Sequence, residues 1–206
     1  MQVVNNDSIF QSCRRKSDDQ SLAPQKIMWM ALDRFKRTNR VNIAVDFYSG
    51  MPTMFSVKKY SDALDALRQK RGVSGYFGHD LVSIDTASRK ATFKKASDGS
   101  TVDVHYTLLH VTPPMGPLNL FKGSPIADAA GWIPVHNGTM QHVKYNNIFS
   151  LGDCSSLPTS KTAAAITAQA PILTENLFSF ADTGKVAGVE YDGYTSCPVG
   201  QILLFF

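Results

Sequence analysis

The sequence YNNIFSLGDCSSLPTSKTAAAITAQ occupies residues 145–169 and decides the fold that we expect for the rest of the chain. The apolar residues between 148 and 151 predict a short buried strand. Gly152 and Asp153 follow directly, so the Asp153 carboxylate is expected at the carboxyl end of a strand, where open α/β folds bind their ligands. The alternative is a strand and a loop that bind nothing.

A helix is expected after this Gly-Asp pair. Pro158 ends regular structure, and either Thr159 or Ser160 can cap the helix. The helix itself opens on Lys161 and Thr162 and continues through three alanines, which have the best helix propensity. Its first turn offers unpaired N–H groups and about half a positive charge, which suits an acceptor-rich or anionic ligand. The alternative is a buried Ala-rich helix without a ligand.

Pro171 lies further along the same helical segment. A proline inside a helix removes a hydrogen bond and clashes with the preceding turn, at a cost of about 3 kcal/mol. We therefore expect a kink or an early end of the helix at this residue.

The upstream half alternates between helix and strand patterns. Apolar spacing predicts helices over residues 25–37 and 56–72, the second ending at Gly72. Strands are predicted over residues 41–50, 73–84, 91–96 and 102–111, with a turn at Asp98-Gly99. Residues 1–22 are polar and are expected to be a loop or a disordered lead-in. This order predicts an α/β fold.

Composition excludes several classes of protein. The chain has 206 residues, of which 43% are hydrophobic and 18% charged, as expected for a globular protein rather than a coiled coil. The net charge of +4 is mild and spread out, so solvated faces explain it better than nucleic-acid binding. No stretch has the roughly 18 apolar residues of a membrane-spanning helix.

The three cysteines, at positions 13, 154 and 197, are far apart and form no CxxC pair. The five histidines form no HxxxH motif, so neither a zinc site nor a disulfide framework is predicted. A redox-active pair stays open, because such a pair need not be close in sequence.

The motif N-x-[IV]-F-x-x-G-D at residues 146–153 resembles the second flavin-contacting motif of flavoproteins with two dinucleotide-binding domains. The longer run GDCSSLPTSKTAAAITAQ is similar to mitochondrial-type sulfide:quinone oxidoreductase. Further motifs follow the family's order: APQKIMW (23–29), LLHVTPPMGP (108–117), SPIADAAGW (124–132) and YDGYTSCP (191–198). The resemblance implies an incomplete FAD/NAD(P)-binding, Rossmann-like fold. Its second domain would combine strand–helix–strand with a β-hairpin.

The resemblance also implies FAD as the cofactor. Asp153 would hydrogen-bond the ribityl–phosphate part of FAD, and Gly152 would let the backbone approach it. Lys161 and Thr162 would lie by the N1–C2=O edge of the flavin, where positive charge stabilises the reduced form. The alternative for Lys161 is a solvated lysine in the first turn of the helix.

The sulfur chemistry that the resemblance implies is thiol–disulfide exchange. Sulfide attacks a cysteine pair and leaves a persulfide, electrons pass to FAD and a ubiquinone-type quinone, and an acceptor takes the sulfane sulfur. Cys197, in GYTSCP, matches one family cysteine. The family's partner position, just before residue 23, carries no thiol here, so either Cys13 pairs with Cys197 or the pair is broken. Cys154 is expected to be a packing residue.

The motifs divide the chain into a lead-in (1–22), a second nucleotide-type domain (23–111), and the carboxyl-terminal part of an FAD domain with the start of a truncated region (112–206). No G-x-G-x-x-G run occurs, so a nicotinamide site is not expected, and the family's amino-terminal Rossmann unit is missing. The chain is therefore expected to be a truncated or incomplete form.

The resemblance places the family at the mitochondrial inner membrane, with peripheral association that is doubtful for this chain. A catalytically inactive interaction module is the alternative function. A relative of type-II NADH:quinone oxidoreductase is a third interpretation, which the missing nicotinamide motif and GYTSCP disfavour.

Overall fold

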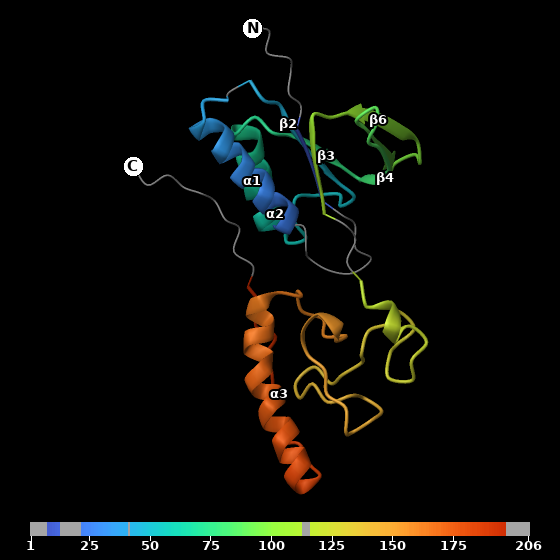
Figure 1. Cartoon of the computed structure of the whole chain (residues 1–206). Helices are drawn as coiled ribbons and strands as arrows, with labels where there is room; N and C mark the ends of the chain where they lie inside the picture. The colour runs from blue at the N-terminus through green and yellow to red at the C-terminus, as the bar shows by residue number, and fades with distance from the viewer. Residues whose placement is uncertain (1–7, 13–21, 41, 113–115, 197–206) are drawn as a thin grey trace. The chain divides into compact units, whose positions relative to one another are not determined.

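The computed structural model describes residues 8–12, 22–40, 42–112 and 116–196. The chain divides between Pro114 and Met115 into two compact units, which are described separately below (Figure 1). Cys13 and Cys197 lie outside the described residues.

The first unit is built on a four-stranded parallel sheet with the strand order β3-β2-β1-β7. Its strands are β1 (Ser8–Ser12), β2 (Val45–Ser49), β3 (Ser74–Phe77) and β7 (Leu108–Val111). Helix α1 (Leu22–Arg37) follows β1, and α2 (Lys58–Lys70) follows β2, so the parallel steps from β1 to β2 and from β2 to β3 use helical crossovers. Both helices match the predicted ones.

Strand β1 corrects the expectation that residues 1–22 form a loop or a disordered lead-in. It pairs in parallel with β2 on one side and β7 on the other, so it occupies an interior position in the sheet. Five residues flanked by polar sequence give little local strand signal. Strand formation depends strongly on the neighbouring strands, and these lie more than thirty residues away in the chain.

A second, antiparallel sheet contains β4 (His79–Asp85), β5 (Lys90–Lys95) and β6 (Thr101–His105). The predicted hairpin strand and the turn at Asp98-Gly99 are present, and Gly99 has a φ of +71°. The strand predicted over 73–84 is wrong as a single element. Gly78, with a φ of +65°, separates β3 from β4 and directs the chain into the other sheet. The strand predicted over 102–111 is likewise two strands, β6 and β7.

An aromatic stack joins the two sheets of this unit. The Tyr48 ring of β2 stacks on Tyr76 of β3 and on Phe93 of β5, with ring centroids 4.3 and 4.1 Å apart. Tyr48 and Phe93 are buried. Burial raises the pKa of the Tyr48 hydroxyl well above its ordinary value, with smaller contributions from Tyr76 and Asp46.

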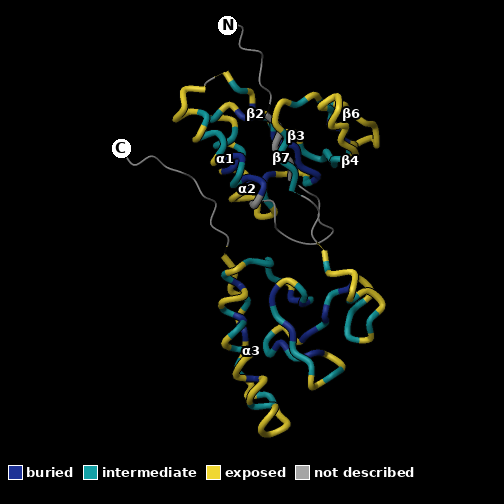
Figure 2. Tube along the Cα trace, in the orientation of Figure 1, coloured by how far each residue is buried: buried dark blue, intermediate teal, exposed yellow. Residues whose placement is uncertain are grey.

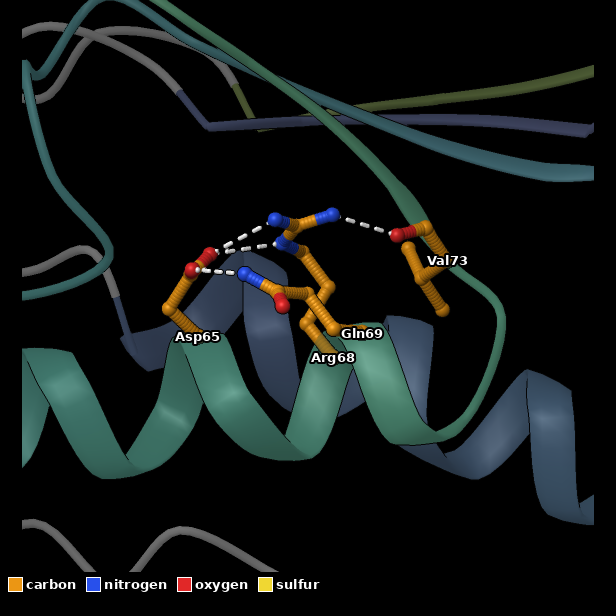
Figure 3. Close-up of polar contacts among 4 residues, drawn as sticks. All are labelled: Asp65, Arg68, Gln69 and Val73. Atoms are coloured by element: carbon orange, nitrogen blue, oxygen red, sulfur yellow. Dashed lines mark hydrogen bonds and ion pairs between the residues drawn. The ribbon is translucent and has the colours of Figure 1, made fainter.

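Arg68 links the end of α2 by a hydrogen bond to Val73, the residue directly before β3 (Figure 3). Its Nε and Nη2 donate to Asp65 Oδ1 at 2.8 and 2.7 Å, and its Nη1 donates to the Val73 carbonyl at 2.5 Å. The same carboxylate accepts a hydrogen bond from Gln69 at 2.6 Å. A Cβ at Gly75 would lie 2.8 Å from the Arg68 guanidinium, so the glycine makes room for this side chain.

The second unit has little regular structure apart from one long helix, α3 (Ala163–Thr183). Two short 3₁₀ turns, η1 (Asn119–Phe121) and η2 (Gly152–Cys154), and isolated β-bridges organise the loops. Their core consists of apolar side chains from separate loops: Ile133, Val135, Met140, Leu157 and Tyr191.

Buried His142 ties two of these loops together. The backbone N–H groups of Lys144 and Tyr145 donate to its Nδ1 at 2.9 and 3.1 Å. Nε2 therefore carries the ring proton and donates to the Ile126 carbonyl at 3.0 Å. With both nitrogens engaged, His142 has a structural role.

Helix α3 continues through Pro171, so the expected early end is wrong, and the alternative, a kink, stays a prediction. The helix continues to a left-handed cap at Gly184, where φ is +74°. Asn176, which is fully buried, anchors the half beyond the proline: its amide donates to the Val189 carbonyl at 2.8 Å and accepts from the Gly188 N–H at 3.1 Å. Tertiary bonds of this kind offset the local cost of the proline.

Among the described residues, no helix combines the length and the apolar character needed to cross a membrane.

Candidate functional site

The predicted strand at residues 148–151 is absent. Phe149 makes only an isolated antiparallel bridge to Gln141, and residues 148 and 149 are half-buried. The bridge aligns the two segments as paired strands would be aligned, but it is a single residue pair and not a ladder. Gly152 then opens the η2 turn, so Asp153 lies in a 3₁₀ turn rather than at a strand end.

Gly152 connects this turn to α3. It is buried, has a φ of +67°, and its N–H donates to Gln169 Oε1 at 2.8 Å. Its carbonyl accepts from the Ser155 hydroxyl at 2.8 Å. A Cβ at Gly152 would lie 3.1 and 3.2 Å from two carbons of Ile166. Both the backbone conformation and the close approach of α3 therefore require glycine here.

The Asp153 side chain is exposed. Within the described part of the chain it has no hydrogen-bond or ion-pair partner. Its two oxygens can therefore accept hydrogen bonds from hydroxyl or N–H groups of a bound molecule.

The cap of α3 is Thr162, and not Thr159 or Ser160 as expected. Thr162 has extended backbone angles, and its Oγ1 accepts the Ala165 N–H at 3.1 Å. The helix therefore begins at Ala163, two residues later than predicted, since the extended backbone of Thr162 marks its boundary. The Thr162 N–H donates to the Ser160 carbonyl at 2.9 Å. The N–H groups of the first two helical residues lie at the positive end of the helix, without intrahelical acceptors.

The ammonium group of Lys161 is bound within the unit. Its Nζ donates to the Ser155 carbonyl at 2.7 Å and lies 4.5 Å from the centre of the Trp132 ring. The solvated-lysine alternative is therefore wrong. Asp128 in turn holds Trp132 in place. The backbone N–H of Trp132 donates to the Asp128 carboxylate at 2.9 Å, and the backbone N–H of Asp128 donates to the Trp132 carbonyl at 2.7 Å.

The segment that precedes Cys197 reaches the start of α3. The hydroxyls of Thr195 and Thr162 are 3.0 Å apart, and Thr195 also donates to the Ser160 carbonyl at 3.3 Å. Tyr191 is buried, and its hydroxyl donates to the Tyr194 carbonyl at 2.5 Å. The Thr162–Thr195 contact could not be predicted from the sequence, because hydroxyl pairs have no periodic signature.

Of the three cysteines, only Cys154 lies among the described residues. Cys154 is half-buried, with its Sγ 3.2 Å from the Ser150 hydroxyl and a hydrogen bond to the Leu151 carbonyl at 3.4 Å, as a packing residue would be. Nothing described bears on Cys13 or Cys197, so their pairing stays a prediction. In the described ranges, no three His, Cys, Asp or Glu side chains gather in a way that could hold a metal ion.

Comparison with curated proteins identifies close relatives. The chain is 50% identical over 179 residues to the mitochondrial sulfide:quinone oxidoreductase of Dictyostelium discoideum, which covers 86% of this chain and 39% of the relative. It is also 50% identical over 191 residues to that of Schizosaccharomyces pombe, covering 88% and 41%. The chain thus spans about two-fifths of the length of these relatives. No protein-family model matches it.

Solved structures show the same fold at low identity. A chain of the Tetrahymena thermophila mitochondrial ATP synthase matches with a TM-score of 0.77 and 18% identity, over 97% of this chain and 49% of that one. The sulfide:quinone oxidoreductase of Aquifex aeolicus matches with a TM-score of 0.70 and 13% identity, over 86% and 44%. The predicted fold class and the predicted resemblance to mitochondrial sulfide:quinone oxidoreductase, as a partial chain, are confirmed.

Proposed function

We propose that this chain is part of a flavin-dependent sulfide:quinone oxidoreductase. One observation carries the proposal. The Thr162–Thr195 contact brings the GYTSCP segment to the start of α3, beside the loop that carries Asp153 and Lys161. The predicted cofactor residues and the sequence that leads to the predicted thiol thus converge within one unit. In this assignment, the predicted residues 23–111 together with β1 form the nucleotide-type domain, and residues 112–206 form the carboxyl-terminal part of the FAD domain.

The described residues fit FAD in part. Asp153 offers an exposed carboxylate for hydroxyl groups, and the positive end of α3, capped by Thr162, offers N–H groups to carbonyl oxygens of a flavin ring. Gly152 contributes to the site by letting the turn pack closely against α3. It does not leave open space for the cofactor, because Ile166 fills the volume beside it. When bound, FAD would take up the two electrons that sulfide loses and release them to a quinone.

Lys161 would stabilise negative charge on the cofactor from the position that its ammonium group occupies in the structure. Its ammonium is fixed by the Ser155 carbonyl and the Trp132 ring, only two residues before the helix begins. A fixed positive charge beside the helix start adds to the helix dipole, and together they would stabilise negative charge on a bound ring.

The thiol chemistry would use Cys197, paired with Cys13 if the predicted pair is intact. Hydrosulfide attacks one sulfur of their disulfide, the S–S bond breaks, and the attacked cysteine becomes a persulfide while the other leaves as a thiolate. An external nucleophile then removes the sulfane sulfur. Thr195, two positions before Cys197 in the sequence, is hydrogen-bonded to Thr162 and to the Ser160 carbonyl at the helix start.

We also propose a mitochondrial setting and a quinone acceptor, supported by the names of the two curated relatives. A ubiquinone-type quinone and a place at the inner membrane are what the family resemblance implies.

The test is a visible spectrum of the purified 206-residue chain with FAD supplied, before and after addition of sulfide. Bound flavin that bleaches in the wild type and in Cys154→Ser, but not in Cys197→Ser, supports the proposal. Cys13→Ser shows in the same way whether Cys13 is the partner. Bound flavin that never bleaches rules out the sulfide chemistry. Failure to bind flavin would leave the chain as a non-catalytic module of this family.

A further inference from the structure

A tight turn in the second unit contains the pair Asn137-Gly138. The turn closes through a hydrogen bond of 2.9 Å from the Met140 N–H to the His136 carbonyl. Asn137 is exposed at this turn and Met140 is fully buried. Other loops of this unit likewise have exposed tips beside buried stretches (Figure 2). The chain contains no other asparagine that is followed directly by glycine.

The two groups of this pair that can react with each other are both available. Among the residues that the structure describes, neither the Asn137 side chain nor the Gly138 N–H makes a hydrogen bond. Gly138 has no Cβ, so no side chain at this residue obstructs the approach of the Asn137 side chain to the Gly138 nitrogen. Asn176 is the opposite case, since it is fully buried and its amide is bonded to residues 172, 188 and 189.

We propose that Asn137 is a site of spontaneous deamidation. The Gly138 nitrogen attacks the Asn137 Cγ, and the new N–Cγ bond closes a succinimide ring. The Cγ–Nδ2 bond breaks, and the side-chain nitrogen leaves as ammonia with the proton of the Gly138 N–H. Water then opens the ring at one of its two carbonyl carbons, which gives aspartate or isoaspartate. In isoaspartate the main chain runs through Cβ and Cγ, so the backbone is longer by one methylene group.

Deamidation would weaken a contact between this turn and a distant segment. The Gly138 carbonyl accepts the Tyr191 N–H at 2.9 Å, and Tyr191 belongs to the core of this unit. The Glu190 side chain packs on Gly138, since a Cβ added there would lie 3.1 Å from Glu190 Cδ. Either product places a second negative charge beside this carboxylate, and like charges at close range repel. Isoaspartate also displaces the Gly138 carbonyl, so both changes loosen its hydrogen bond to Tyr191.

The experiment follows the purified 206-residue chain by peptide mass spectrometry during incubation in warm, mildly alkaline buffer. We expect a mass gain of about 1 Da in the peptide that contains Asn137, and methyl transfer by an isoaspartyl methyltransferase identifies isoaspartate. Asn137 should react at least about tenfold faster than Asn119 or Asn146, which precede residues with side chains; this ratio is about 1.4 kcal/mol in barrier height. Asn137→Gln is the matched control, because its longer side chain must close a larger ring, and its peptide should keep its mass.

Hydrogen exchange at the Tyr191 amide tests the consequence. After incubation this amide should exchange several-fold faster in the wild type and should be unchanged in Asn137→Gln. The site is overturned if Asn137 converts no faster than Asn119 in a chain that circular dichroism shows to be folded. The consequence is overturned if Tyr191 exchanges equally in converted and unconverted protein. Neither measurement needs flavin or sulfide, so the inference is tested apart from the proposed function.

Discussion

Replacing Gly152 with alanine should destabilise the second unit by about 0.5–3 kcal/mol. Two costs contribute. A left-handed backbone at a φ of +67° costs a non-glycine residue about 1–2 kcal/mol, and displacing Ile166 from its rotamer adds about 0.5–1.5 kcal/mol. The lower entropy of the unfolded alanine chain returns about 0.4–1 kcal/mol.

Gly184→Ala separates these two costs. Gly184 has a similar φ of +74°, but no atom lies within 4 Å of its added Cβ. This variant should therefore show the backbone cost alone. Ile166→Ala removes the two carbons that the new Cβ would meet, so Gly152→Ala should cost less in that background than in the wild type.

Urea unfolding followed by tryptophan fluorescence provides the measurement. The chain has two tryptophans, and Trp29 lies in the first unit, so a Trp29→Phe background leaves Trp132 to report on the second. Equal losses in Gly152→Ala and Gly184→Ala, with no coupling to Ile166→Ala, would refute the argument that close packing against α3 requires this glycine.

Three other predictions concern single contacts. Arg68→Ala should destabilise the first unit by about 1–3 kcal/mol in urea unfolding, because charged hydrogen bonds to Asp65 and Val73 are lost, and Arg68→Lys should not restore them. Thr162→Ala should cost about 1 kcal/mol by removing the helix cap, whereas Thr162→Ser should be nearly neutral in the same assay. Hydrogen bonds from Thr92, and then from Lys90, lower the pKa of the Asp103 carboxyl in the folded protein. The contribution of Asp103 to folding stability is therefore fully present above the ordinary Asp pKa. It is lost as the pH falls through the lowered pKa of the folded state. An NMR titration should show the Asp103 pKa rising in Thr92→Val, and an unchanged pKa would contradict this cause.

The sequence predicted the elements whose signal is local. Helices α1 and α2 have apolar residues at helical spacing, and Gly72 ends α2 where expected. The hairpin turn at Asp98-Gly99 is determined by its own residues, since the Asp98 carboxylate accepts the Ser100 N–H at 2.9 Å. These features need no information from distant parts of the chain.

The elements that were missed depend on distant partners. Strand β1 exists because β2 and β7 pair with it, and α3 passes Pro171 because Asn176 is bonded to residues 188 and 189. Within the site, the cofactor roles of Gly152 and Asp153 stay predictions, and the sequence did not indicate that Lys161 would be bound by Ser155 and Trp132. Each of these contacts joins segments whose spacing follows no repeat.

The two buried amides of α3 explain why the site assembles where it does. Gln169 holds the Gly152 turn near the start of the helix, and Asn176 holds Val189 further along it. From Asn176 back to Thr162 the helix rises about 21 Å, at 1.5 Å per residue. The six residues from Val189 to Thr195 span at most about 20–22 Å when extended, which is close to this rise. The returning segment therefore has little slack, and the anchor at Asn176 brings Thr195 to Thr162 at the positive end of the helix.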